Sequence, residues 1–381
     1  MAASREVDKG GRRSETSGLL HFGRDMVSAL AMALIAIVYV IQAFRIPTGS
    51  MEKSLLVGDF LLGLKFVYGA PLLPFDTFGT FAKFPALADP GPGDVVIFKY
   101  PGTDRKDYIK RCVAGPGQTV RIEGRNLYVD GKEAILPPRG QHIRGGRVPV
   151  AGLPFNTRLM DFKPLRIPAR GDTIRADTLE VREFHFLKQL VLQEHPLKRV
   201  RAEYQFYLDG GFVRSFDFEG EDNWTRIAYE IEMIRRRLKQ ERPDAAVEVR
   251  KLLYLGDERI QRYVVKNDNY FMMGDNRDNS TDSRFWGYLN RRFVKAKAFI
   301  LYFSLDKDVP FFLLPLKIRW GRIGMLIRSW DGGIPPPPQS GIPSITPEGS
   351  SSAAAAPSFL PHPATTSFRG QPCFVGRRPA G

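Results

Sequence analysis

The sequence predicts a mostly β protein that carries one N-terminal membrane-spanning helix. An apolar run from Met26 to Phe44 contains no charged residue. Short runs of β-branched and aromatic residues recur between turn residues, which is typical of strands. These runs are Asp59–Lys65, Asp94–Tyr100, Tyr108–Val113, Asn126–Lys132, Tyr263–Met273 and Val294–Ser304.

Composition narrows the class of protein further. Hydrophobic residues make up 43% of the chain and charged residues 25%, as in ordinary globular proteins. The net charge of +15 favours either nucleic acid or an acidic membrane surface as a partner. No nucleic-acid-binding motif is visible, so we expect membrane lipid and no nucleic acid. The two cysteines and five scattered histidines disfavour a structural zinc, and no metal ion or cofactor is expected.

The N-terminal region divides into a leader and a membrane anchor. Residues 1–25 are polar and basic, and we expect a disordered cytoplasmic leader. Residues 26–44 would form a helix about 28 Å long, close to the roughly 30 Å hydrocarbon core of a bilayer. A cleaved signal sequence would have a shorter apolar core and a small-x-small cleavage site, which Gln42–Arg45 lacks. Basic residues before the span favour a cytoplasmic N-terminus, and the body would then be extracytoplasmic.

The body divides into two core halves around an insertion. Residues 45–117 contain short strands and turns, and residues 262–308 contain further strands. Between them, residues 118–261 lack a catalytic motif and are predicted to form an inserted cap domain. Within it we expect a strand ending at Asp130-Gly131 and a helix over Asp222–Glu241. One face of that helix carries Ile227, Ile231, Ile234 and Leu238, and Pro243 follows it.

Three segments remain. The Phe66–Pro90 stretch is rich in Phe, Leu, Pro and Gly, and it either covers a core or places its rings in lipid. Residues 309–330 resemble a short basic helix with Trp, which either lies at the membrane interface or packs on the body. Residues 331–381 are rich in Pro, Ser and Ala, and we expect a disordered tail.

Ser50 is the candidate nucleophile, in a segment just outside the apolar run. A serine hydroxyl needs a base, yet none of the five histidines lies in a recognisable motif, and no G-x-S-x-G elbow is present. A lysine can serve if its amine is neutral. Its pKa must fall from about 10.4 to roughly 7–8, which burial among apolar groups achieves.

Two lysines could be that base. Lys53 completes an S-x-x-K pattern, as in penicillin-interacting serine hydrolases, but neither Lys-Thr-Gly nor Ser-Asp-Asn follows in the chain. Glu52 beside it would favour a charged amine. Lys110 lies in an alternating strand, where it would share a face with Tyr108 and Cys112. A lone strand lysine is ordinarily solvated.

Three motifs in order resemble those of bacterial type I signal peptidases. Pro47-Thr48-Gly49-Ser50-Met51, with Leu55 and Gly58-Asp59, is similar to their nucleophile segment. Asp107–Val113 followed by Gly115-Pro116-Gly117 is similar to their general-base segment. Gly274–Gly287, which reads GDNRDNSTDSRFWG, is similar to their third conserved box. With Gly93-Asp94-Val95-Val96, the resemblance covers residues 26–117 and 262–304.

This resemblance implies a fold, an activity and a location. The fold would be a signal-peptidase-like core of antiparallel coiled sheets. The activity would be that of a membrane-bound serine endopeptidase that removes signal peptides from exported preproteins after Ala-x-Ala-like sites. The enzyme would be a single-pass protein of the bacterial cytoplasmic (inner) membrane, with its catalytic domain on the extracytoplasmic face. We expect a monomer.

The resemblance also implies residue roles. Ser50 would be the nucleophile and Lys110 the general base. The Thr48 hydroxyl and the Ser50 amide would bind the oxyanion, Ser280 would orient the Lys110 amine, and Asp282 and Arg284 would form a supporting ion pair. Small apolar substrate pockets would be lined by Phe44, Ile46, Pro47, Met51, Leu55, Tyr108 and Ile109.

The sequence departs from the family pattern at two positions, and other interpretations of the third box and of the function are open. The family usually has proline where Lys53 stands, and a serine is often seen where Thr48 stands. Asp275, Asp278 and Asp282 could instead form a calcium loop, although the final bidentate glutamate is missing, or the box could hold mere turn formers. A catalytically dead homologue that acts as a membrane scaffold would lack a catalytic residue, and none is missing.

Overall fold

The computed structural model describes residues 11–72, 83–102, 106–142 and 162–338. Parts of the predicted segments therefore lie outside the described residues: 1–10 of the leader, 73–82 of the aromatic stretch, 103–105 of the first core half, 143–161 of the insert and 339–381 of the tail. Residues 1–340 belong to one unit.

The N-terminal helix differs at both ends from the expected 26–44 segment. Helix α1 spans Gly11–Ile35 and continues as a π-helical turn over Ala36–Val40. It begins inside the predicted leader because hydropathy marks only the membrane-compatible part. No proline interrupts residues 11–25, although three of them are glycines. The predicted disorder of residues 11–25 is therefore wrong. His21–Val40 is long and apolar enough to cross a membrane, with a mean hydropathy of 1.6 and none of it buried.

The end of the apolar run belongs to the body. Strand β1 (Ile41–Arg45) pairs antiparallel with β2 (Asp59–Leu64). Hydropathy could not place this boundary, because an apolar strand and an apolar helix look alike by composition. Pairing with β2 satisfies the backbone groups that the helix no longer bonds.

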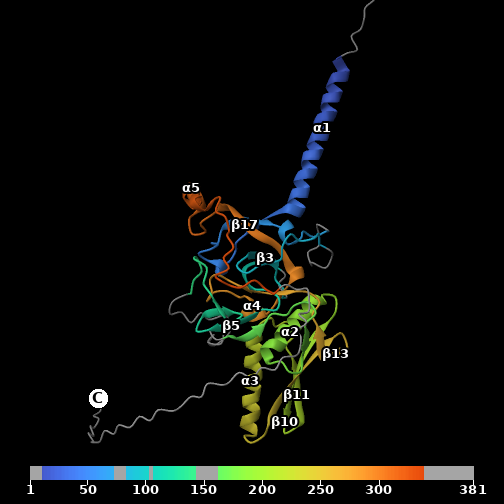
Figure 1. Ribbon diagram of the computed structural model, residues 1–381, viewed down its shortest axis with the longest axis vertical. Coiled ribbons are helices and arrows are strands. Elements are labelled where there is room, and N and C mark those ends of the chain that lie inside the picture. Colours follow the sequence, from blue (N-terminus) through green and yellow to red (C-terminus); the bar gives the residue numbers. More distant parts are fainter. Residues whose placement is uncertain (1–10, 73–82, 103–105, 143–161, 339–381) are drawn as a thin grey trace, which may run out of the picture. The chain divides into compact units, whose positions relative to one another are not determined.

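The main sheet unites the two predicted core halves. Its strands run antiparallel in the order β1-β2-β17-β3-β4-β15-β16. Strand β17 lies between β2 and β3 (Figure 1), so residues distant in sequence share one sheet. The mostly β, antiparallel fold class is confirmed. The strands not yet located are β3 (Val95–Lys99), β4 (Asp107–Ala114), β15 (Asn269–Met273), β16 (Leu289–Asn290) and β17 (Val294–Ser304).

The insert adds two four-stranded antiparallel sheets. The first, in the order β7-β6-β5-β8, contains β5 (Thr119–Glu123), β6 (Asn126–Val129), β7 (Lys132–Ala134) and β8 (Phe162–Arg166). The second, in the order β11-β10-β12-β13, contains β10 (Val200–Leu208), β11 (Gly211–Asp217), β12 (Val247–Leu255) and β13 (Glu258–Ile260). A separate pair joins β9 (Thr173–Arg175) to β14 (Arg262–Val264). Val120 and Leu127 of the insert share a buried cluster with Phe271 of β15, so the insert and the main sheet have a continuous core.

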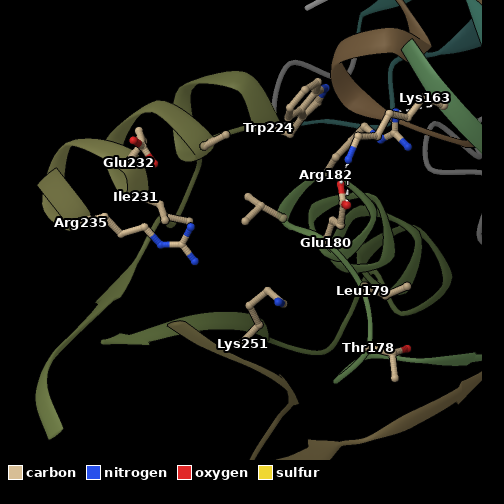
Figure 2. Close-up of a pocket in the computed structure, with 12 residues that line it drawn as sticks. Lys163, Thr178, Leu179, Glu180, Arg182, Trp224, Ile231, Glu232, Arg235 and Lys251 are labelled. Carbon is tan, nitrogen blue, oxygen red and sulfur yellow. Dashed lines mark hydrogen bonds and ion pairs between the residues drawn. The ribbon is translucent and has the colours of Figure 1, made fainter. Parts of the chain in front are cut away.

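Two helices of the insert pack against one another and against β12, and they border the pocket drawn in Figure 2. Helix α3 (Trp224–Glu241) confirms the prediction over 222–241. Asn223 caps it by accepting a hydrogen bond from the Thr225 N–H (3.0 Å). Helix α2 (Val181–Glu194) was not expected, although its apolar residues repeat at helical spacing.

The predicted turn at Asp130-Gly131 is confirmed. Both residues have positive φ, 51° and 78°, and they join β6 to β7. Glycine and aspartate tolerate this left-handed backbone better than most residues, which is why such pairs favour tight hairpins.

The described part of the aromatic stretch is divided between core and surface. Tyr68 is 1% exposed, whereas Phe66 and Phe84 are exposed by 38% and 47%. The stretch therefore covers the core with one ring and presents others to the surroundings.

The segment 309–330 does not form the short basic helix that its composition suggested. It contains 3₁₀ turns over Phe311–Leu313 and Trp320–Arg322 and one helical turn, α5 (Leu314–Lys317). Pro310 and Pro315 prevent a continuous helix, because proline lacks the backbone N–H that a helix interior requires.

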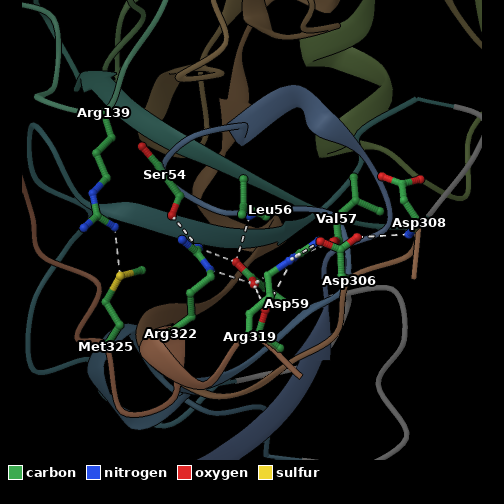
Figure 3. Close-up of polar contacts among 11 residues, drawn as sticks. Ser54, Leu56, Val57, Asp59, Arg139, Asp306, Asp308, Arg319, Arg322 and Met325 are labelled. Carbon is green, nitrogen blue, oxygen red and sulfur yellow. Dashed lines mark hydrogen bonds and ion pairs between the residues drawn. The ribbon is translucent and has the colours of Figure 1, made fainter. Parts of the chain in front are cut away.

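A buried carboxylate fastens this segment to the turn that follows Ser50 (Figure 3). Asp59 is fully buried and accepts hydrogen bonds from Arg322 Nε (3.0 Å) and Ser304 Oγ (2.7 Å). Arg322 also donates to the Ser54 carbonyl (3.1 Å). Arg319 Nη1 donates a hydrogen bond to the carbonyl of Val57 (3.1 Å). These two arginines therefore face the protein, while three apolar side chains of the segment stay more than half exposed: Phe312, Leu316 and Trp320.

The first residues of the expected disordered tail are ordered, so the predicted boundary at 331 is wrong. Ile334 is 8% exposed, and the Gly332 carbonyl accepts a hydrogen bond from the Ile135 N–H (2.9 Å). The Pro335 carbonyl accepts another from Gln118 Nε2 (3.0 Å). Proline loses little conformational freedom on docking, so a proline-rich composition does not by itself imply disorder.

Candidate active site

Ser50 lies in a 3₁₀ turn, Gly49–Met51, between β1 and β2. The Asn276 N–H donates to the Ser50 carbonyl (3.1 Å), and Asn276 Nδ2 donates to the Gly49 carbonyl (3.1 Å). The third motif therefore holds the backbone of the first. Sequence analysis did not assign Asn276 this contact, because the partners are far apart in the chain.

Lys110 reaches Ser50 from strand β4. Its Nζ lies 2.7 Å from Ser50 Oγ, which is hydrogen-bond distance. The Lys110 side chain is buried, with 3% of the residue exposed. Its other described hydrogen bond goes to the carbonyl of Ile109 (3.2 Å). The two residues predicted to form a nucleophile–base pair are therefore brought together.

Burial lowers the pKa of the Lys110 amine to about 8. Asp282 and Asp275 act in the opposite direction, but an arginine already binds each of them. Arg284 contacts Asp282 through two hydrogen bonds (2.8 and 2.9 Å), and Arg111 contacts Asp275 in the same manner (2.8 and 2.7 Å). With both carboxylates neutralised, desolvation dominates, and a useful fraction of the amine is neutral near pH 7.

The predicted Asp282–Arg284 ion pair is thus present and buried. The Asp282 carboxylate also accepts a hydrogen bond from the Gly274 N–H (3.0 Å), which ties the pair to the loop above Lys110. Sequence analysis missed the second pair, Arg111–Asp275. Both residues lie in the motifs, since Arg111 follows Lys110 and Asp275 is the second residue of the third box, but only the fold shows that they meet.

A groove of about 770 Å³ opens over the two side chains. Six of the seven predicted substrate-binding residues line it: Phe44, Ile46, Pro47, Met51, Tyr108 and Ile109. Leu55 does not line it, but packs in the core beneath, where it is 1% exposed. Polar residues that were not predicted also border the groove: Arg45, Lys106, Asp107, Asp278, Asn279 and Thr281.

Thr48 and Ser280 line the same groove. Thr48 is exposed and has extended backbone (φ −130°, ψ 155°). Ser280 Oγ is buried and has no hydrogen-bond partner among the described residues. The hydrogen bond from Ser280 to the Lys110 amine is therefore absent from this structure, and the orienting role of Ser280 stays a prediction.

The geometry does not favour Lys53 as the base. Lys53 is exposed, does not line the groove and has a left-handed backbone (φ 70°). Proline, whose φ is fixed near −65°, could not adopt this conformation. The geometry also disfavours a calcium loop, because arginines bind Asp275 and Asp282. Within the described residues, no group of three or more His, Cys, Asp or Glu is placed to hold a metal ion.

Comparison with known proteins gives a consistent picture. The family model described as "Signal peptidase, peptidase S26" matches residues 19–146 and 165–303. Signal peptidase I of Pseudomonas aeruginosa is 27% identical over 297 residues, which cover 75% of this chain and 73% of the relative. Signal peptidase I of Aquifex aeolicus is 27% identical over 286 residues, which cover 74% of this chain and 84% of the relative. Signal peptidase I of Helicobacter pylori (strain 26695) is 25% identical over 297 residues, which cover 75% of this chain and 82% of the relative.

Proposed function

The chain belongs to the signal peptidase family, peptidase S26, and from this premise we propose that it removes N-terminal signal peptides from exported preproteins with a Ser50–Lys110 dyad. The observation that carries the proposal is the 2.7 Å contact between Ser50 Oγ and a buried Lys110 amine. A serine endopeptidase needs an activated hydroxyl and a base in reach of it, and this contact provides both.

The first half of the reaction forms an acyl-enzyme. The neutral Lys110 amine removes the Ser50 proton as Oγ attacks the scissile carbonyl carbon. Negative charge then develops on the carbonyl oxygen, where the Ser50 N–H and the Thr48 hydroxyl would donate hydrogen bonds. The protonated amine next gives its proton to the departing nitrogen, the C–N bond breaks, and the mature chain leaves with a new amino terminus.

The second half regenerates the enzyme. A water molecule attacks the ester carbonyl while Lys110 accepts its proton. The same oxyanion donors stabilise the second tetrahedral intermediate, and the proton returns to Ser50 Oγ as the signal peptide leaves. Two steps with modest barriers thus replace one difficult hydrolysis.

The groove supports a preference for small residues before the cut. Apolar side chains line it beside Ser50, and small pockets between such side chains would exclude large substrate residues. Alanine fits at both contact positions, so Ala-x-Ala sites are the expected substrates.

The pH dependence of kcat/KM is expected to follow the Lys110 amine. Its pKa is lowered to about 8, and only the neutral form can act as a base. The rate should therefore rise with pH, reach half of its plateau near pH 8 and fall about tenfold for each pH unit below. Initial rates measured across this range with a soluble peptide substrate test it. A plateau already reached at pH 6 would contradict the assignment.

The N-terminal segment supports a proposal for attachment to lipid and for the orientation of the chain. The span His21–Val40 and the exposed Phe312, Leu316 and Trp320 support anchoring and a second contact with the bilayer. Basic residues before the span favour a cytoplasmic N-terminus. We propose a single-pass, monomeric protein of the cytoplasmic membrane with its catalytic body on the extracytoplasmic face.

A cleavage assay tests the function. The full chain, purified in detergent, is incubated with a preprotein that carries an Ala-x-Ala site, and mass spectrometry locates the cut. We expect one cut after the second alanine, and its loss when that alanine is replaced by a large residue. An intact preprotein under these conditions, with a folded enzyme, would contradict the proposal.

A further inference from the structure

A second pocket lies in the insert, apart from the residues that line the catalytic groove. It has a volume of about 690 Å³, a size typical of ligand sites. Four elements border it: β8, the start of α2, one face of α3 and β12. Figure 2 shows side chains from these elements around a common opening.

The floor of this pocket is apolar. Trp224, Ala228 and Ile231 recur at helical spacing along α3, so they present one face of that helix to the opening. Leu179, which precedes α2, and Val181, its first residue, border it from the other side. Such a surface favours an aromatic or aliphatic group of a ligand.

The rim of the pocket is charged. Two of its cationic side chains are paired with carboxylates, and two are not, within the part of the chain that the structure describes. Lys163 pairs with Glu180 (2.9 Å), and Arg182 is bound to Glu183. Glu232 is bound by Arg236, which does not line the pocket (3.0 Å).

Arg235 and Lys251 are the two remaining cations, and among the described residues neither has a hydrogen bond or an ion pair with a carboxylate. Both point into the opening from α3 and β12 (Figure 2). Burial lowers the pKa of Lys251, and the charge of Arg235 lowers it further, while Glu180 and Glu183 act in the opposite direction. An anion between the two cations would relieve their repulsion.

The first turn of α2 also borders the pocket. Val181 and Arg182 are its first residues, and both line the pocket. The N–H groups at the start of a helix have no partner within the helix and carry partial positive charge. The carboxylates of Glu180 and Glu183 at this helix start are already bound by Lys163 and Arg182, so the preference for an anionic ligand rests on Arg235 and Lys251.

The pocket is also joined to the catalytic half of the molecule. Trp224 Nε1 donates a hydrogen bond to the carbonyl of Arg284 (2.7 Å). Arg284 follows the loop 278–281, which forms one wall of the catalytic groove. An extended chain advances about 3.3 Å per residue, so the number of residues between the cut and an acidic pair sets how far along the body that pair can reach.

We propose that this pocket binds an acidic segment of the mature part of the preprotein, in which an Asp or Glu stands beside a large apolar residue. The carboxylate would lie between Arg235 and Lys251, and the apolar side chain would contact Trp224 and Ile231. This inference rests on the proposed function, because it assigns the ligand to the chain that Ser50 cleaves.

Binding is measured first, with full-length Ser50→Ala protein in detergent so that nothing is cut. Two synthetic peptides are compared, one with a Glu-Phe pair and one with Gln-Phe. We expect the acidic peptide to bind about tenfold more tightly, as for a charge-assisted contact. The double variant Arg235→Gln/Lys251→Gln should lose this preference. Arg237→Gln is the matched control, since Arg237 is an exposed residue of the same helix outside the pocket.

Cleavage is measured next, with active enzyme and two preproteins that differ only by this Glu→Gln change. We expect a KM about tenfold lower for the acidic preprotein at unchanged kcat, because the contact is made equally in the ground and transition states. The double variant should equalise the two KM values.

The outcomes separate this inference from the proposed function. Equal binding of the two peptides, or a preference that survives in the double variant, would overturn the pocket assignment even if both preproteins are cleaved. Equal KM values despite selective binding would overturn its role in substrate recognition. Binding of anionic lipid vesicles in place of the peptide, lost in the double variant, would overturn the choice of a peptide. Failure to cleave either preprotein would instead count against the proposed function, and the binding measurements would still decide what the pocket recognises.

Discussion

Ser50→Ala and Lys110→Met are each expected to lower kcat/KM for an Ala-x-Ala preprotein by about 10⁴-fold or more, the order expected when a nucleophile or its base is lost. Alanine removes the attacking oxygen. Methionine fills the volume of the buried lysine stem but cannot accept a proton, so Ser50 remains a poorly nucleophilic hydroxyl. The measurement is the cleavage rate of purified variants in detergent, with thermal unfolding recorded to show that each variant is folded.

Lys53→Ala provides the control for this experiment. Lys53 is exposed and does not line the groove, so the variant should keep most of the wild-type rate. The reverse pattern, in which Lys110→Met stays active and Lys53→Ala does not, would transfer the role of base to Lys53. It would also support the S-x-x-K type of hydrolase that the sequence left open.

Gly274→Ala is expected to disrupt the site without touching a catalytic side chain. A Cβ at position 274 would lie 2.3 Å from Ser280 Oγ and 2.6 Å from the Ser50 carbonyl oxygen. Both distances are far below van der Waals contact, so the Ser50 turn or the Ser280 loop must move. A displacement of about 1 Å can cost about 100-fold in rate, and forced overpacking typically costs about 1–3 kcal/mol of stability.

The measurements for Gly274→Ala are kcat/KM and the free energy of unfolding. Gly321→Ala is the matched control, because a Cβ at that position meets nothing within 4 Å. We expect the control to behave like the wild type. Full activity of Gly274→Ala would show that the loop adapts freely, and that the close approach of the third motif to Ser50 does not determine the rate.

The local structure was predictable where a pattern has one physical solution. The run Val294–Ser304 matches β17 residue for residue, since apolar and β-branched residues without glycine or proline leave a strand as the stable choice. The helix over 224–241 was recognisable from its apolar face. The predicted strand over 263–273 was too long: it splits into β14 and β15, because the Glu194 carboxylate binds the N–H groups of Lys266 and Asn267 between them.

The sequence-based predictions were wrong or undecided where the composition of a segment is compatible with more than one structure. The apolar residues Ile41 and Phe44 suit a membrane helix and a sheet equally, and only pairing with β2 placed them in the sheet. The proline run after Asp331 resembles disorder by composition, yet its first residues dock on the body. The composition of residues 309–330 left a lipid surface and packing on the body as alternatives, and only the fold shows that the partner of Arg319 and Arg322 is Asp59.

The residue types alone offered Ser50 as a nucleophile and left Lys53 and Lys110 as alternative bases, and the resemblance of three motifs to those of type I signal peptidases nominated Lys110 and the Asp282–Arg284 pair. Whether Lys110 is a base depends on its surroundings: burial in the sheet lowers its pKa, and arginines neutralise the two nearest carboxylates. These are long-range contacts between β4 and the third motif, and no local pattern encodes them. The cation pair of the insert, Arg235 and Lys251, likewise comes together only because α3 packs beside β12.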